Sequence, residues 1–139
     1  MRFAKVVFTG AGIWGLAVLT PLFWLVDITG RHYPPPTEYP QFFYGFIAVA
    51  MAWQIAFLII GSDPARFRLM MIPAMIEKLG YVSLLAVLYS RSRISSLDLQ
   101  PAFPDGLLGL LFVASFFATR QQSSSVRLQP DRDVRSVRL

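Results

Sequence analysis

Cysteine is absent from the 139-residue chain, and histidine occurs only once. Without thiols the protein forms no disulfide, and it has no thiolate metal site or thiol nucleophile. Charge is also scarce: 15% of the residues are charged, whereas a typical soluble domain has about 25%. The shortage of charge argues against a soluble protein and leaves long stretches of apolar sequence.

Hydrophobic residues make up 55% of the sequence and gather in four blocks. Each block is close in length to the roughly 20 residues that an α-helix needs to cross a bilayer. The sequence therefore predicts an all-α membrane protein, a four-transmembrane-helix bundle that forms one domain over residues 1–119. The predicted spans are residues 6–26, 42–60, 69–89 and 102–119.

Basic residues are distributed unevenly around these spans. One side of the predicted bundle has nine of them: Arg2, Lys5, Arg66, Arg68, Arg120, Arg127, Arg132, Arg135 and Arg138. The other side has three: Arg31, Arg91 and Arg93. Because Lys and Arg are enriched on the cytoplasmic side, both termini are predicted to be cytoplasmic. Residues 120–139 are predicted to form a disordered basic tail.

The net charge of +5 is also compatible with a nucleic-acid-binding protein. The basic residues flank apolar blocks, however, which is the pattern that orients a membrane protein. The predicted partner is therefore the lipid bilayer, and no nucleic-acid partner is predicted.

Gly10, Gly12 and Gly15 have the G-x-G-x-x-G spacing of a dinucleotide-binding loop. Such a loop is followed by an amphipathic helix and, about 20 residues on, by an acidic residue. Here Asp27 comes earlier and the sequence before it is apolar, so no cofactor is predicted. We interpret Ala11 and Gly15 instead as a small-xxx-small pair at which another helix packs closely.

Small residues also recur along the second span, at Gly45, Ala48, Ala52 and Ala56. This stripe is predicted to face another helix. In the turn that follows, Asp63 is a candidate helix N-cap. Since the adjacent proline suits the first helical position, the third helix is expected to begin here.

Glu77 and Lys78 interrupt the third span. At about 1.5 Å per residue, Glu77 lies roughly 13 Å beyond Arg68, near the midplane of a bilayer core. Charges at this depth face the bundle interior and are candidates for a proton or cation site. The alternative, which the sequence favours, is a satisfied polar network that fixes the register of the helices. We expect Gln54 to donate a hydrogen bond to Glu77 and a tryptophan ring to face Lys78. The predicted intramembrane site comprises Glu77, Lys78, Gln54, Tyr81 and Trp14.

A second candidate cluster lies at the predicted outer mouth and comprises Asp27, Arg31, His32, Glu38 and Asp105. His32 has two acidic residues near it, which raises the question of a metal site. A single histidine without a second strong ligand is more often a surface residue, so no metal is predicted.

The motif D-P-A-R-F-R at residues 63–68 is followed by Glu77–Lys78 and then by Asp105 at the start of the fourth span. A proline-rich loop at residues 33–40 precedes them. Over residues 30–117 this pattern resembles a group of small four-helix bacterial membrane proteins loosely related to the DoxX-like proteins. The resemblance implies a four-helix bundle in a bacterial inner membrane and little about activity.

Three functions remain open. The sequence favours a non-enzymatic scaffold or accessory subunit, which would associate with a second copy or with a membrane partner. The alternative is a small proton- or cation-coupled transporter that uses Glu77. A second alternative is a lipid- or sterol-modifying membrane enzyme with its site at the outer mouth. Replacing Glu77 by Gln would abolish transport, whereas an enzyme would depend on outer-mouth residues such as His32.

Overall fold

The computed structural model describes residues 1–24 and 40–127, which contain helices and no strand. The long helices are α1 (Arg2–Leu19), α3 (Pro40–Ser62), α4 (Met71–Ser90) and α5 (Ala102–Arg127). Two short 3-10 helices precede α4 and α5, η1 (Arg68–Met70) and η2 (Leu97–Leu99). Four stretches are long and apolar enough to cross a membrane: Arg2–Trp24, Gln41–Ser62, Arg68–Ser90 and Leu97–Thr119. The prediction of an all-α chain with four membrane-length helices is thus confirmed, and a multi-pass membrane protein is indicated.

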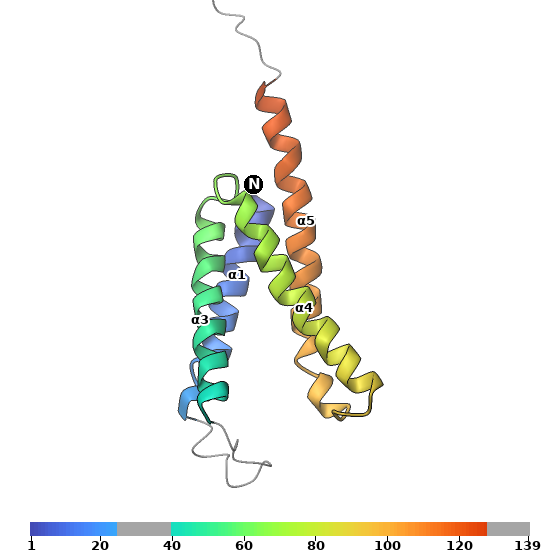
Figure 1. The fold of residues 1–139 in the computed structure, drawn as a ribbon. Helices are drawn as coiled ribbons and strands as arrows, with labels where there is room; N and C mark the ends of the chain where they lie inside the picture. Colours follow the sequence, from blue (N-terminus) through green and yellow to red (C-terminus); the bar gives the residue numbers. More distant parts are fainter. Residues whose placement is uncertain (25–39, 128–139) are drawn as a thin grey trace, which may run out of the picture.

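The helices form two pairs (Figure 1). α1 packs along α3 and α4 packs along α5, while α1 also touches α5. By contrast, α3 and α4 have little contact with each other. The two pairs meet at the end that contains the N-terminus and the α3–α4 turn, and they diverge toward the opposite end (Figure 1). The far end of α5 lies on the N-terminal side as well, as an even number of spans requires.

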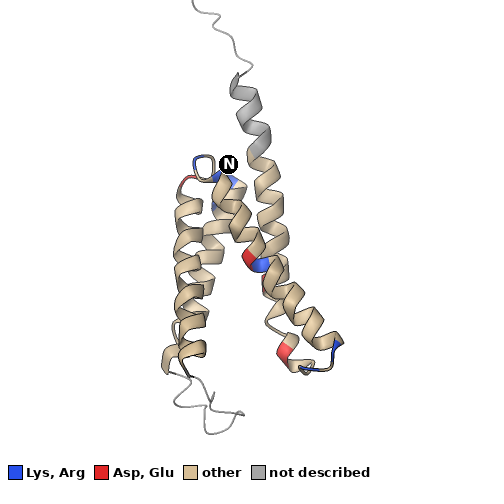
Figure 2. Cartoon of the chain, in the orientation of Figure 1, with Lys and Arg blue, Asp and Glu red and all other residues tan. Residues whose placement is uncertain are grey.

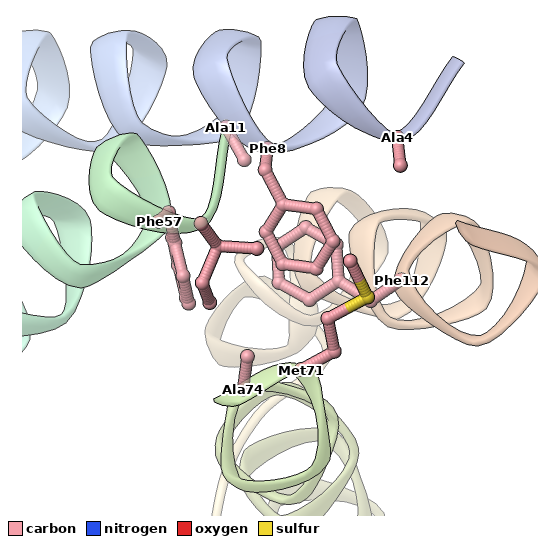
Figure 3. Packing of buried hydrophobic residues seen from close by; sticks show 8 residues of the cluster. Ala4, Phe8, Ala11, Phe57, Met71, Ala74 and Phe112 are labelled. Carbon is pink, nitrogen blue, oxygen red and sulfur yellow. The ribbon is translucent and has the colours of Figure 1, made fainter. Parts of the chain in front are cut away.

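The core occupies the end at which the pairs converge (Figure 3). Three fully buried phenylalanines from three helices contact one another there: Phe8, Phe57 and Phe112. The rings of Phe8 and Phe112 stack with centroids 4.2 Å apart, and Phe57 meets Phe112 edge-on at 4.9 Å. Met71 and Ala74 bring the first turns of α4 into the same cluster. Ring contacts of this kind favour offset or edge-to-face geometry, so the cluster fixes how the two pairs meet.

Glycine allows α1 and α3 to approach closely. A Cβ atom on Gly12 would lie 2.7 Å from the Leu58 side chain and 2.8 Å from the backbone oxygen of Gln54. A Cβ atom on Gly15 would overlap the Gln54 side chain. The predicted close helix contact is therefore confirmed at Gly15, with α3 as the helix that packs there, but its second small residue is Gly12, whereas Ala11 is buried in the core cluster.

The predicted small-residue stripe on the second span is wrong for three of its four residues as a contact between described helices, and the fourth, Ala56, is half-buried. Gly45, Ala48 and Ala52 are exposed, and no atom lies within 4 Å of a Cβ built on Gly45. α3 instead turns Ile47 and Phe57 inward. The glycines that permit the close approach are mainly on α1, so the larger side chains of α3 fill the space that they leave.

The start of the third helix also differs from the prediction. Asp63 accepts a hydrogen bond from the backbone N–H of Arg66 at 3.2 Å, so it caps a turn, and α4 begins only at Met71 after η1. The reason is that Asp followed by Pro is equally a turn signature. Arg68 then ties the start of this stretch to α5, donating from Nε to the Phe116 oxygen at 3.3 Å.

Two other helix boundaries differ from the predicted ones. α1 ends at Leu19 because Pro21 lacks an N–H and its ring interferes with the preceding turn. α5 continues to Arg127, so the polar tail does not begin at residue 120 as expected. No glycine or proline interrupts residues 120–127, and extending an existing helix is far easier than starting one. The rest of the predicted tail, residues 128–139, lies outside the described residues.

Candidate functional site

An ionic cluster joins α4 to α5. The Lys78 Nζ atom lies 2.9 Å from Asp105 Oδ1 and 3.5 Å from Glu77 Oε1. The Lys78 side chain is only 7% exposed, and those of Glu77 and Asp105 are 22% and 23% exposed. Elsewhere the helices carry few charges, as the coloured residues midway along α4 make clear (Figure 2). Gly109 helps α5 approach, since a Cβ there would lie 2.9 Å from the Leu79 side chain.

Asp105 was grouped with the outer-mouth candidates, but the structure pairs it with Lys78 of the predicted intramembrane site. The fourth membrane-length stretch begins at Leu97, before α5 itself, because η2 and the residues around it extend the apolar segment. Asp105 therefore lies deeper in that stretch than a span starting at residue 102 implies, level with Lys78. The other outer-mouth candidates lie outside the described residues: Asp27, Arg31, His32 and Glu38.

Two expected contacts of the polar layer are not formed. Gln54 is buried, but its Nε2 donates to the Ala50 oxygen one turn back at 3.0 Å, and not to Glu77. The ring that Lys78 faces is that of Phe57, 5.6 Å from Nζ to the centroid, and not a tryptophan. Phe57 takes this place because the aromatic core fixes its ring next to α4, whereas Trp14 is 59% exposed.

A cavity of about 560 Å³ lies between the two helix pairs. All five residues of the predicted intramembrane site line it, namely Trp14, Gln54, Glu77, Lys78 and Tyr81, and Asp105 joins them. Most of the remaining wall is apolar and includes Phe46 and Trp53. A shared cavity thus brings the predicted polar residues together, and of the five only Lys78 and Glu77 are described as hydrogen-bonded to each other.

The ionic cluster is not balanced. It contains two carboxyl groups and one ammonium, so its charge is −1 when all three groups are ionised. Glu77 Oε2 is buried and has no hydrogen-bond partner in the part of the chain that the structure describes. An uncompensated buried charge is costly, and one added proton or one further cation would offset it. The ionic cluster is therefore suited to taking up a proton or a cation from the cavity and to releasing it again.

Sequence reasoning missed two features of this site, the depth of Asp105 and the ring of Phe57 beside Lys78. The apolar residues Leu97 and Leu99 were the available signal for the first, because they show that membrane-like sequence begins before Asp105. Nothing in the sequence indicated that the Phe57 ring lies next to Lys78, because the sequence does not specify which residues of two helices contact each other.

Comparison of the chain with family models, curated proteins and solved structures finds no match. The resemblance to DoxX-like proteins therefore stays a prediction. No family assignment follows, and the function has to be inferred from the chemistry of the cavity and its charged wall.

Proposed function

We propose that the protein binds a small molecule in the cavity between the two helix pairs and acts as a proton- or cation-coupled transporter. One observation carries the proposal: the ionic cluster of Glu77, Lys78 and Asp105 lines a cavity. A network that served only to fix helix register would be packed on every side. The volume of about 560 Å³ falls within the roughly 300–1,000 Å³ of ligand pockets in proteins.

Each group of the cluster has a distinct role in this proposal. Asp105 holds Lys78 through the shorter ion pair, at 2.9 Å. Glu77 is held more loosely, at 3.5 Å, and retains an unpartnered oxygen. Glu77 is therefore the group that takes up and releases a proton as the ligand binds and leaves. Ionisable residues within membrane spans commonly mark such pathways.

The transporter proposal replaces the scaffold as the leading function, although one observation still favours a scaffold. Among the described helices none covers the exposed residues Gly45, Ala48 and Ala52, and small residues of this kind suit close packing with another helix. A scaffold would use this face to bind a second copy or a membrane partner. No observation on the described residues favours a lipid-modifying enzyme. Asp105 is the one described candidate for its site, and its carboxyl group is ion-paired with Lys78.

A matched pair of substitutions on α3 tests whether the cavity binds ligands. Ala50 lines the cavity, whereas Ala52 is exposed and does not. Ala50→Phe should fill the site and abolish binding, and Ala52→Phe should leave binding unchanged. The measurement is thermal unfolding of the detergent-purified proteins with cationic, anionic and neutral phenylalkyl probes. A bound probe at a hundredfold excess over Kd should stabilise the parent by about 2.7 kcal/mol.

Unfolding without any probe serves as the control that all three proteins are folded. If a probe stabilises the Ala50→Phe and Ala52→Phe variants equally, it binds outside the cavity and the proposed function fails. It also fails if no probe of any charge class stabilises the parent.

We also propose a bacterial inner-membrane location with both termini in the cytoplasm. What supports it is the excess of basic residues on the terminal side, nine against three. A reporter enzyme that is active only outside the cytoplasm, fused after Leu139, should give no signal. The same reporter inserted after Arg93 should be active, and the opposite pattern would overturn the orientation.

A further inference from the structure

We infer that the cavity takes an amphipathic organic cation, a molecule with an apolar or aromatic body and one positive charge. The inference rests on the proposed function, because it assumes that the cavity is the ligand site. Three properties of the described wall lead to it: its charge balance, its aromatic side chains and its opening.

The charge balance of the wall favours a cation. Lys78 is the one basic residue among the described residues that line the cavity, and it already contacts both carboxyl groups. An anionic ligand would therefore find no free positive partner and would face Glu77 and Asp105. A monovalent cation would instead balance the excess negative charge of the cluster, in surroundings where charges are weakly screened.

The aromatic wall favours an organic cation over an inorganic ion. Trp14, Phe46, Trp53 and Tyr81 line the same cavity as the ionic cluster. Ring faces attract ammonium groups, tryptophan most strongly. A divalent metal ion, by contrast, requires several oxygen ligands, and this wall is largely apolar. In a ligand with an ammonium group on an apolar body, the ammonium group can contact the ring faces and the carboxyl groups, and the apolar body can contact the apolar wall.

The opening of the cavity favours an amphipathic ligand. Trp14 and Phe46 line the cavity yet are 59% and 55% exposed, on α1 and α3 respectively. α3 and α4 have little contact, so the cavity is open between the two helix pairs. In a membrane this opening faces lipid, and a ligand that enters there has to partition into the bilayer first. An apolar body provides that partitioning.

Three probes with the same phenylbutyl body and different charge test the inference. These are (4-phenylbutyl)trimethylammonium, 4-phenylbutanesulfonate and 4-phenylbutanol, titrated against the purified full-length protein in an uncharged detergent. Intrinsic tryptophan fluorescence reports binding, because Trp14 and Trp53 line the cavity. We expect the ammonium probe to bind at least tenfold more tightly than either of the others.

Two carboxyl-to-amide variants show whether the preference comes from the cluster. Glu77→Gln removes the excess negative charge and should weaken binding of the ammonium probe at least fivefold. Asp98→Asn removes a fully exposed carboxyl group outside the cavity wall and should leave binding unchanged. If both variants bind the ammonium probe equally more weakly than the parent, the probe is attracted by the overall negative charge of the surface. The inference would then be wrong.

The two proposals fail in different ways. If the sulfonate or the alcohol binds as tightly as the ammonium probe, and Ala50→Phe blocks that binding, the cavity is a ligand site and only the cation inference is overturned. If no probe binds the parent, the proposed function is wrong, and the cation inference is wrong as well because it rests on that function.

Discussion

Lys78→Met should lower the free energy of unfolding by about 3–5 kcal/mol, the usual cost of removing one partner from a buried ion pair. Lys78 is almost fully buried and is the ammonium group between Glu77 and Asp105. Methionine keeps most of the volume, so the loss comes from two carboxyl groups left without their cation. Denaturant unfolding in mild detergent measures it, with Lys5→Met as the matched control at an exposed site on α1.

Two further measurements separate charge from packing. A triple variant, Glu77→Gln with Lys78→Met and Asp105→Asn, removes all three charges and should recover much of the lost stability. Acidification should also reduce the deficit of Lys78→Met, because a protonated carboxyl group needs no cation. If the triple variant is as unstable as the single one and pH has no effect, the loss is one of packing and the ionic cluster does not stabilise α4 against α5.

Gly12→Leu should destabilise the protein by on the order of 3 kcal/mol, whereas Gly10→Leu should be neutral or slightly stabilising. Even a Cβ atom on Gly12 would lie 2.8 Å from the backbone oxygen of Gln54, which cannot move aside as a side chain can. Gly10 lies two residues away on the same helix and has no atom within 4 Å of the corresponding position. There leucine simply replaces glycine with a better helix former.

Thermal unfolding of the two leucine variants beside the parent measures this difference. Gly12→Leu should also lower the yield of folded protein, because α1 could no longer seat against α3. Equal stability of the two variants would mean that the close approach of α1 and α3 is not required for the fold.

The number and type of helices could be predicted because each span is a continuous apolar block of membrane length. The close contact of α1 with another helix was predicted too, since small residues at Ala11 and Gly15 allow it by their size alone. The face that α3 buries could not be predicted. It depends on the helix opposite: the side chains of Gln54 and Leu58 occupy the space left by glycines of α1, and so the stripe around Ala48 faces outward.

The candidate site was predicted in part for a similar reason. Counting residues along each span predicted that Glu77 and Lys78 share a layer with Gln54 and Trp14, and the structure places these four residues and Tyr81 in one cavity wall. That Asp105 of α5 is the ion-pair partner of Lys78 could not be predicted from the sequence. The identity of this partner depends on how α4 and α5 cross and on where the apolar segment before Asp105 begins, which residue counts from a single helix do not give.

The polar contacts of α4 have a mechanical consequence. Arg68, in η1 just before α4, binds the Phe116 oxygen of α5, and Lys78 of α4 binds Asp105 of α5. Between the two helix pairs the contacts include the packing of Phe112 against Phe8 and Phe57 and the approach of the Lys78 ammonium to the Phe57 ring. If the two pairs separate around the aromatic core, the ion pairs of Lys78 stay together, because Glu77, Lys78 and Asp105 all belong to α4 and α5. Most of the surface between the pairs is apolar, and lipid tails pack against such surface about as well as protein does, so widening the cavity would break no ion pair and would cost only the contact of Lys78 with the Phe57 ring.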